Sequence, residues 1–309
     1  MKINRIGGVI AAASKKDAEP LLQIGTIPII KRIVISFQQA GIFPIVVVTG
    51  TQEEEVKYQL SSYGVIFIPN EDCEQPELFD SVKIGLQYLS GKCDRIVFTP
   101  VNVPMFTPDT LNHLLASEGD IIVPSCRNRG GHPLVLSEDI VPQIISYSGN
   151  GGLRGAISSM EDRRIFVPVN DPGIHMTVRD CSQLEACLTK HNQALLHPTV
   201  QLSLQKESVF FNTRIKLLLY LILDTHSVRS ACDRMALSYG KAWDMLNKLE
   251  AEAGYPIVER KHGGRRGGNT TLTPKGLQFL INWLLLEDKV FRFTQNEFTT
   301  LFHDSGIFT

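Results

Sequence analysis

Four basic side chains stand close together in a glycine-rich run near the end of the chain, KHGGRRGG. They are Lys261, His262, Arg265 and Arg266. Cationic side chains attract phosphate, and glycines let the backbone approach a phosphate chain or a minor groove closely. The run therefore indicates a hairpin that binds a polyanion, although on these residues alone it could equally be a solvated surface turn.

Three helix-like segments, with apolar residues at three- and four-residue spacing, precede this hairpin, and a long one follows it. The two segments nearest to the hairpin on its N-terminal side form the candidate helix-turn-helix. Serine is a favoured N-cap, and Ser227 and Ser238 stand where the two helices would begin. Ala231 is small enough for the helices to cross closely. This order of elements predicts a winged helix-turn-helix, in which the start of the second helix faces the bases of the major groove. We expect Ser238, Tyr239, Lys241, Ala242 and Asp244 at a DNA surface, and Trp243, Leu246 and Leu249 in the core.

The charge is uneven along the chain. The whole sequence carries 31 Lys+Arg and 32 Asp+Glu, a net charge of −1. Residues 1–205 account for −4, residues 206–292 for +5, and the remaining C-terminal residues for −2. Only the second of these regions suits a polyanion, so the near-zero total does not argue against a nucleic-acid partner.

Length and composition favour a two-domain protein of the cytoplasm. The 309 residues are 43% hydrophobic, enough for a core in each domain. The six cysteines are scattered without a CxxC pair, which argues against a zinc knuckle and a disulfide framework. No apolar run approaches the roughly 20 residues that span a bilayer, and the N-terminal run is too short for a signal segment. We expect no membrane partner and assign no metal site.

The first 190 residues alternate short β-branched runs with amphipathic stretches. The candidate strands are 6–12, 45–49, 65–69, 95–99, 120–124 and 165–168, and the candidate helices are 27–39, 53–62, 78–89 and 108–117. Near-continuous apolar runs such as IVVV are typical of strands in a parallel sheet that is covered on both faces. This predicts an α/β fold with a Rossmann-like, mostly parallel sheet, whose ligands bind at the carboxyl ends of the strands.

The pattern changes after residue 190, which sets the expected domain boundaries. We expect the α/β domain at 1–190 and a linker with a short strand or hairpin at 191–208. The winged helix-turn-helix would occupy 209–292, followed by a C-terminal tail at 293–309.

The segment SYGKAWDMLNKLEAEAGYPIVERKHGGRRGGNTTLTPKG closely resembles the DNA-binding domain of molybdate-responsive regulators, relatives of the LysR-type winged helix. The specific elements are SYxxAWD, the GGxxGG wing and LTPKG, and the similarity covers about residues 199–290. It implies sequence-specific binding to double-stranded DNA, usually as a dimer, with Ser238, Tyr239 and Lys241 at recognition-helix positions. Such regulators typically carry a molybdate-binding domain after this module. Only about 20 residues follow the closing helix here, which argues against molybdate sensing by that route.

The first 190 residues resemble the nucleotidyltransferase domain of molybdenum-cofactor guanylyl- and cytidylyltransferases. The matching elements include GGVIAAA, PLLQIGTIPIIKR, FTPVNVPMFTPDTL, RGGHPLVLS and VNDPGIHMTVRD. The resemblance implies a nucleotidyltransferase fold with a phosphate-binding loop after the first strand. It maps contacts to a nucleotide or other ligand onto Ala12, Ala13, Ser14, Lys15, Asn102, Gly131 and His132.

Several positions depart from the pattern of these enzymes. Ala13 stands where a glycine is expected, Glu19 replaces a lysine before PLL, and Asn102 replaces the metal-binding aspartate. The second acidic site reads Thr177, Val178, Arg179. A carboxylate repels phosphate, and an amide cannot supply the anionic ligand that Mg²⁺ prefers. We therefore expect that nucleotidyl transfer is lost, with Mg²⁺ as a cofactor only if the activity survives.

Two histidines need separate interpretations. His132 could act as a general base, but without a metal partner we expect a structural or ligand-contacting role. His175 stands alone among apolar residues and is expected to pack in an apolar strand.

Together these observations predict a DNA-binding transcriptional regulator with a degenerate nucleotidyltransferase-like domain that senses a small molecule or forms oligomers. The effector would be a nucleotide, a molybdopterin or a molybdenum-related compound, and the assembly a homodimer. The main alternative is an active molybdenum-cofactor nucleotidyltransferase, dependent on CTP or GTP, fused to a DNA-binding domain. A third interpretation is a winged helix used only for protein contacts.

Overall fold

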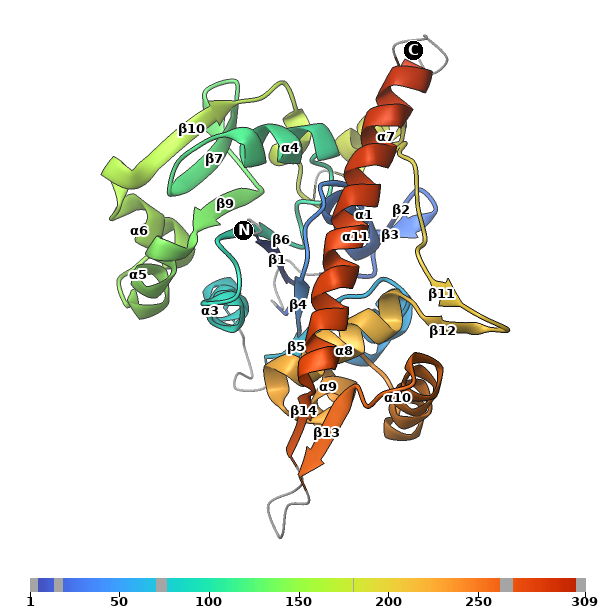
Figure 1. Cartoon of the computed structure of the whole chain (residues 1–309). Coiled ribbons are helices and arrows are strands. Elements are labelled where there is room, and N and C mark those ends of the chain that lie inside the picture. The colour runs from blue at the N-terminus through green and yellow to red at the C-terminus, as the bar shows by residue number, and fades with distance from the viewer. Residues whose placement is uncertain (1–4, 14–18, 71–76, 180, 262–268, 304–309) are drawn as a thin grey trace. The chain divides into compact units, whose positions relative to one another are not determined.

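The computed structural model describes residues 5–13, 19–70, 77–179, 181–261 and 269–303 (Figure 1). The chain divides into two compact units. The first unit comprises Met1–Leu60 and Val65–Leu196, and the second comprises Ser61–Gly64 and His197–Thr309. Each unit is described by itself below.

The first unit is built on a mostly parallel sheet with the strand order β10, β7, β9, β6, β1, β4, β5. The strands are β1 (Ile6–Ala11), β4 (Ile45–Thr49), β5 (Ile66–Pro69), β6 (Arg95–Pro100), β7 (Ile121–Cys126), β9 (Leu134–Ser137) and β10 (Arg164–Pro168). Strand β9 runs antiparallel to both of its neighbours, and the short strand β8 (Arg129–Gly130) pairs with β7. The expected α/β fold with a mostly parallel sheet is confirmed.

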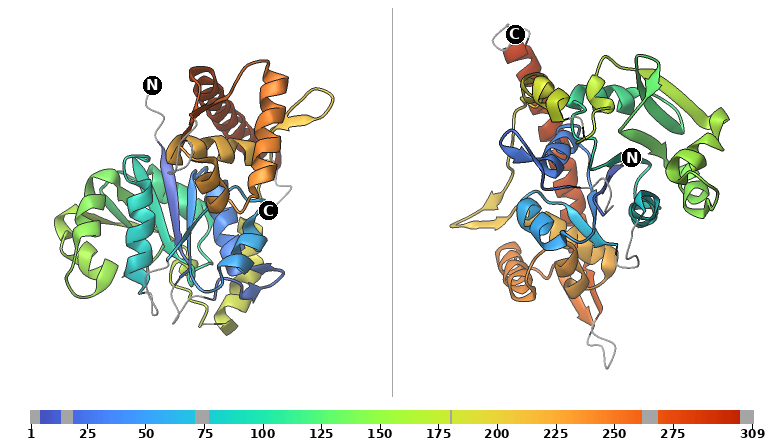
Figure 2. Two further views of the ribbon diagram at one scale, coloured as in Figure 1. Left: turned by 90° about the horizontal axis from the view of Figure 1, so that it is seen from below. Right: turned by 180° about the vertical axis from the view of Figure 1, so that it is seen from behind.

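Helices cover both faces of this sheet because the central strand β1 presents two glycines to them (Figure 2). A Cβ on Gly7 would lie 2.7 Å from the Cys93 sulfur, on the side of α3 (Leu78–Leu89). A Cβ on Gly8 would lie 2.6 Å from the Phe37 ring of α1 (Ile29–Gln39). Successive residues of a strand point to opposite faces, so the two glycines admit one helix on each side.

The remaining elements of the first unit surround this core. They are β2 (Gln23–Ile24), β3 (Ile27–Pro28), α2 (Glu53–Leu60), α4 (Pro108–Ala116), α5 (Val141–Ser146), α6 (Gly152–Ser158) and α7 (Cys181–Ala194). The six predicted strands and four predicted helices are all present within one or two residues. The predictions lacked the strands β2, β3, β8 and β9 and the helices α5 to α7. Apart from α7, these elements are too short to show a clear periodicity in the sequence.

A buried arginine joins α1 to α7. Arg32 is 1% exposed, and its Nε and Nη2 donate to the carbonyl of Ile24. Its Nη1 donates to Asn192 Oδ1 (2.8 Å) and lies 3.3 Å from His191 Nδ1. His191 Nε2 is 3.2 Å from the carbonyl of Phe106. These contacts fit a neutral His191 that accepts from Arg32 and donates to Phe106.

The second unit contains three helices, a β-hairpin and a long closing helix, preceded by a small hairpin. Its elements are β11 (Leu204–Gln205), β12 (Val209–Phe211), α8 (Thr213–Thr225), α9 (Val228–Arg234), α10 (Tyr239–Ala253), β13 (Val258–Lys261), β14 (Asn269–Leu272) and α11 (Pro274–Phe298). Apolar residues of α8 at three- and four-residue spacing are buried, as in Ile215, Leu218, Leu219 and Ile222. This order agrees with the expected winged helix-turn-helix.

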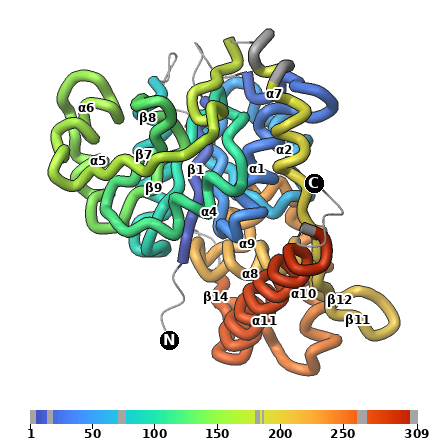
Figure 3. Tube along the Cα trace, turned by 90° about the horizontal axis from the view of Figure 1, so that it is seen from above, coloured from blue at the N-terminus to red at the C-terminus, as the bar shows by residue number. Residues whose placement is uncertain are grey.

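The closing helix α11 covers the core of the second unit with its first half (Figure 3). The buried ring of Phe211 meets Phe279 and Trp283 of α11 edge-on, at centroid distances of 4.8 and 4.7 Å. Lys216 of α8, 7% exposed, forms an ion pair with Glu287 at 2.7 Å. No helix in the described residues combines the length and the apolarity that crossing a lipid bilayer requires.

Two expected boundaries differ from the observed ones. Helix α7 continues past residue 190 to Ala194, because His191 and Asn192 are held by Arg32. Helix α11 continues past residue 292 to Phe298 and is followed by a π-helical turn, Thr299–His303. Much of the segment expected as a tail is therefore helical.

The buried contact between Arg32 and His191 predicts a stability that depends on pH. Burial and the Arg32 guanidinium lower the pKa of His191 to about 4. In the unfolded chain this pKa is about 6.5, so the unfolded state binds more protons between these two values. The free energy of unfolding should therefore fall by about 3 kcal/mol for this group as the pH decreases through that window, and stay constant above it.

Urea unfolding of wild type and His191→Gln between about pH 4 and pH 7 measures this contribution. The variant should show a weaker pH dependence than wild type. His113→Gln, on an exposed face of α4, is the matched control and should behave as wild type. A His191→Gln variant that keeps the full dependence would show that His191 does not cause it.

Candidate functional site

The carboxyl ends of β1, β4 and β6 meet at one edge of the sheet in the first unit. The N–H of Val101, just after β6, donates to the carbonyl of Ala11 at the end of β1 (3.0 Å). Ala13 packs against Gly50, where a Cβ would lie 2.9 Å from the Ala13 Cα. Ala12 and Ala13 are buried. The predicted positions at the ends of β1 and β6 thus share this edge, as the parallel topology requires.

Asn102 follows β6 at the same edge. Its carbonyl accepts a hydrogen bond from the N–H of Val178 (3.0 Å). Its side-chain Oδ1 is buried and has no hydrogen-bond partner among the described residues. A buried oxygen without a donor costs about 1 to 3 kcal/mol, so such an atom marks a place where water or a ligand completes the structure. Ser14 and Lys15, predicted beside it, lie outside the described residues.

Gly131 and His132 lie in the bend between β8 and β9. The His132 N–H donates to the carbonyl of Ile174 (3.0 Å), and a Cβ on Gly131 would lie 2.5 Å from that same oxygen. The His132 ring meets the Phe98 ring edge-on at 5.7 Å, and its Nδ1 is buried without a partner among the described residues. Burial and the nearby His175 lower the pKa of His132 to about 4. A neutral imidazole with so low a pKa is a weak base at neutral pH and suits contact with a ligand.

A cavity of 1420 Å³ opens beside His132 in the first unit. Its wall combines the rings of Phe79, Phe98 and Phe166 with three arginines, Arg129, Arg154 and Arg164. Glu77 and Glu161 also line it. Apolar rings with guanidinium groups can hold a ligand that has a flat part and an anionic part. None of the three arginines was predicted as a site residue: Arg129 begins the RGGHPLVLS segment, but Arg154 and Arg164 lie outside the matching elements, and only folding brings the three together.

The prediction for His175 was wrong. His175 does not lie in a strand but follows a short 3-10 turn, Pro172–Ile174, and is only partly buried. Its Nε2 lies 2.8 Å from the carbonyl of Arg129. A hydrogen bond to the β8 backbone, not apolar packing, therefore fixes this ring.

The buried carboxylate of Asp171 has a structural role, because neighbouring backbone and side-chain groups donate hydrogen bonds to both of its oxygens. It accepts hydrogen bonds from the N–H and hydroxyl of Thr107, the hydroxyl of Thr110 and the N–H of Gly173. In the described part of the chain, no three His, Cys, Asp or Glu side chains come close enough together to hold a metal ion.

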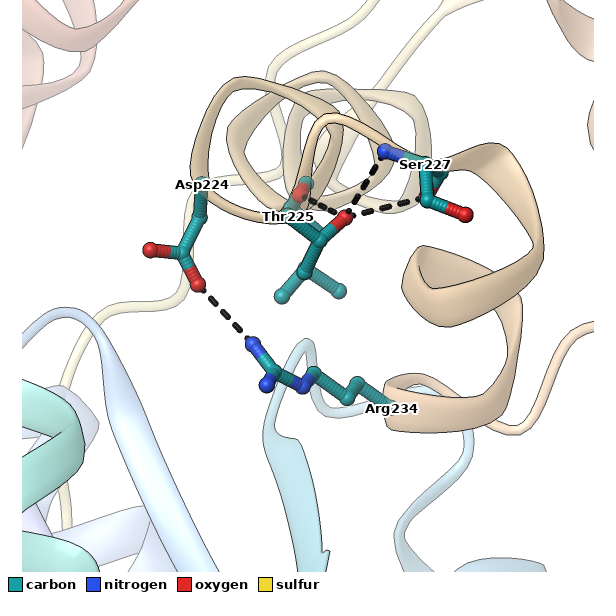
Figure 4. A network of polar contacts seen from close by, with 5 residues as sticks. Asp224, Thr225, Ser227 and Arg234 are labelled. Carbon is teal, nitrogen blue, oxygen red and sulfur yellow. Dashed lines mark hydrogen bonds and ion pairs between the residues drawn. The ribbon is translucent and has the colours of Figure 1, made fainter. Parts of the chain in front are cut away.

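The helix-turn-helix of the second unit begins at a polar network between α8 and α9 (Figure 4). The Thr225 hydroxyl lies 2.8 Å from the Leu221 carbonyl and accepts from the Ser227 N–H (3.2 Å). The Ser227 hydroxyl accepts from the N–H of Ser230, which confirms Ser227 as the N-cap of α9. An ion pair between Asp224 and Arg234 (2.9 Å) spans the same turn. These contacts fix the angle at which α9 leaves α8.

Helix α10 stands at the recognition-helix position. The Ser238 hydroxyl accepts from the N–H of Lys241 (3.4 Å), which confirms it as the N-cap. Tyr239 is 46% exposed and Lys241 is exposed. Ala242 is 0% exposed, so its expected place at a DNA surface was wrong: its methyl group lies on the face of α10 that packs into the unit.

The predicted core face of α10 is correct for Leu246 and Leu249, both 0% exposed, but not for Trp243. Trp243 is only half-buried, because it lies between Tyr239 and Arg260 instead of inside the core. Asp244 is exposed, as expected.

The predicted hairpin corresponds to β13 and β14, which pair in register from Val258 with Leu272 to Lys261 with Asn269. The side chain of Lys261 lies outside the described part of the chain, as do His262, Arg265 and Arg266. Their role at a DNA surface stays a prediction.

Comparison with known proteins supports both resemblances. Residues 15–164 match the family of the MobA-like NTP transferase domain. A nucleotidyl transferase from Methanothermobacter thermautotrophicus is 22% identical with a TM-score of 0.52, over 62% of this chain and 98% of that one. Rv0371c from Mycobacterium tuberculosis is 19% identical with a TM-score of 0.50, over 60% of this chain and 100% of that one. At these identities the similarity shows a shared fold.

The C-terminal region matches two curated proteins. The molybdenum transport protein ModE of Azotobacter vinelandii is 38% identical over 76 residues, 25% of this chain and 28% of that protein. The transcriptional regulator ModE of Haemophilus influenzae is 30% identical over 95 residues, 30% of this chain and 37% of that protein. The chain thus spans about a third of the length of these relatives.

The network in Figure 4 predicts that the Thr225 hydroxyl stabilises the second unit. Thr225→Val keeps the shape of the side chain but leaves the Ser227 N–H without its acceptor, which should cost about 1 to 2 kcal/mol of unfolding free energy. Urea unfolding followed by circular dichroism measures the loss. Thr225→Ser keeps the hydroxyl and is the control, with a smaller expected loss. Equal losses in the two variants would mean that the methyl group, not the hydroxyl, stabilises this turn.

Proposed function

We propose that this protein is a DNA-binding transcriptional regulator whose second unit binds an operator. The observation that carries this proposal is the helix-turn-helix of the second unit, whose α10 exposes Tyr239 and Lys241 at a serine-capped start. The excess of cations between residues 206 and 292 supports a polyanionic partner. The similarity to two ModE proteins, named for molybdenum transport and transcriptional regulation, supports a link to molybdenum.

In this proposal the first unit is a sensor that keeps the nucleotidyltransferase fold without its metal chemistry. Asn102 offers a neutral amide at the end of β6, and Glu19 offers a carboxylate where a cation would hold phosphate. The unpartnered atoms of Asn102 and His132 and the cavity beside His132 support the binding of a ligand. The proposed ligand is a nucleotide, a molybdopterin or a molybdenum-related compound. The proposed contacts are Ala12, Ala13, Ser14, Lys15, Asn102, Gly131 and His132.

The assembly proposed for operator binding is a homodimer that pairs two recognition helices. The second half of α11 exposes two large apolar side chains seven residues apart, Leu286 (43% exposed) and Phe293 (65% exposed). A ligand that prefers one arrangement of the paired chains would change DNA affinity through linkage. Sedimentation of the purified chain should give the mass of two copies, and a monomer at concentrations that bind DNA would contradict this arrangement.

The second candidate function is an active nucleotidyltransferase fused to a DNA-binding unit. The match of residues 15–164 to the MobA-like NTP transferase domain favours it, together with the cavity of the first unit. Mg²⁺ would be its cofactor.

The DNA-binding proposal predicts a steep salt dependence. Binding that neutralises several phosphates releases counterions, so the logarithm of the association constant should fall linearly with the logarithm of salt concentration. Replacing Arg265 and Arg266 with alanine should flatten this slope by about two if both contact phosphate. Fluorescence anisotropy with a labelled duplex measures the slope. Binding that does not depend on salt, or no binding, would favour a winged helix used for protein contacts.

The loss of catalysis predicts that no pyrophosphate is released when the purified protein is incubated with Mg²⁺, molybdopterin and CTP or GTP. Coupled detection of pyrophosphate measures this. Turnover that disappears in Asn102→Ala or His132→Ala, and so belongs to this site, would establish the enzyme instead.

A further inference from the structure

Four side chains of the second unit form a continuous row in which two aromatic rings lie between two cations. The guanidinium carbon of Arg229, on α9, lies 5.4 Å from the centre of the Tyr239 ring. The Tyr239 and Trp243 rings meet edge-on at 6.0 Å, with an interplanar angle of 81°. The guanidinium carbon of Arg260, on β13, lies 3.9 Å from the centre of the Trp243 ring. We call these four residues the ladder.

The ladder joins the recognition helix to the hairpin. Tyr239, Trp243 and Asn247 are spaced by four residues and so lie along one stripe of α10. Arg260 reaches the end of this stripe from β13, where its Nη2 donates to Asn247 Oδ1 (3.2 Å). A DNA duplex that contacts both the start of α10 and the hairpin would therefore pass over this row.

The two arginines of the ladder keep their charge available. Both are exposed, and neither forms an ion pair with a carboxylate within the described residues. In contrast, Arg234 is paired with Asp224, and Arg292 with Asp288. A guanidinium stacked on a ring still presents its N–H groups at its edge, where they can meet phosphate oxygens.

From this geometry we propose that the ladder is a DNA-contacting surface in which Arg260 binds the phosphate backbone and Trp243 is the platform that positions it. The inference rests on the proposed DNA binding of the second unit and adds to it a specific cation and the reason for a half-buried tryptophan. An arginine already held on a ring loses less side-chain freedom when it binds, so the contact is stronger than that of a free cation.

The first test is a set of salt titrations of the full-length chain on a fluorescein-labelled mixed-sequence duplex of about 30 base pairs, started at low salt. Arg260→Ala should reduce the slope of log affinity against log salt by about one. Arg260→Lys keeps the charge and should keep the slope, while affinity falls about two- to fivefold because the planar stacking is lost. Trp243→Leu should lower affinity by a similar factor and have no further effect when added to Arg260→Ala.

Arg292→Ala is the matched control, a cation of the same unit about 27 Å along α11 from the hairpin end of that helix, and should bind as wild type. Thermal unfolding checks that each variant folds. A steep wild-type slope that Arg260→Ala leaves unchanged would overturn the ladder while leaving DNA binding intact. Additive effects of Trp243→Leu and Arg260→Ala would overturn the positioning role. A wild-type chain that does not bind the duplex would overturn both the ladder and the proposed function.

The second test measures the solvent accessibility of Trp243 in the ladder by fluorescence quenching. The chain has two tryptophans, and Trp283 is 3% exposed, so quenching by acrylamide reports mainly on Trp243. Saturating duplex should protect Trp243 from acrylamide, and Trp243→Leu should remove the effect. If bound DNA leaves Trp243 as open to acrylamide as before, the ladder faces away from DNA and the proposal fails.

Discussion

A buried polar group without a partner is costly, and in the first unit Arg32 and Asp171 meet this constraint whereas two atoms of the candidate site do not. The buried guanidinium of Arg32 makes polar contacts with Ile24, His191 and Asn192, and the Asp171 carboxylate accepts four hydrogen bonds. These satisfied groups fix α1, α4 and α7 against the sheet. Asn102 Oδ1 and His132 Nδ1 are buried without partners in the described residues. Since a buried polar atom without a partner is costly, these two atoms lower the stability of the fold unless water or a ligand pairs with them.

The fold of the first unit does not depend on the positions at which a metal would be held. The strands and helices of the first unit depend on apolar burial and on the close approach of helices to Gly7 and Gly8. None of those interactions involves the positions that would hold a metal. An amide at Asn102 is therefore compatible with an intact nucleotidyltransferase fold, and the cavity beside His132 persists. Binding a ligand without transforming it is what such a unit needs in order to act as a sensor.

In the second unit the basic side chains differ in whether they contact a carboxylate or an aromatic ring. Arg234 and Lys216 are paired with carboxylates and stabilise the helices, whereas Arg229 and Arg260 rest on aromatic rings and keep their charge exposed. Charge alone, counted as +5 along residues 206–292, does not distinguish these two uses. The distinction depends on which side chains lie opposite each cation after folding.

Local patterns in the sequence determined much of this protein. Period and composition located the strands of the sheet, and two serines located the starts of α9 and α10, because N-capping and side-chain alternation act within a few residues. Only the tertiary structure decided the rest. In the tertiary structure Ala242 is buried, and Trp243 lies outside the core against Arg260. His175 forms a hydrogen bond with the backbone of a strand. Folding also gathers Arg129, Arg154 and Arg164 around one cavity. Each of these outcomes depends on contacts between residues far apart in sequence, whose free energies no local pattern contains.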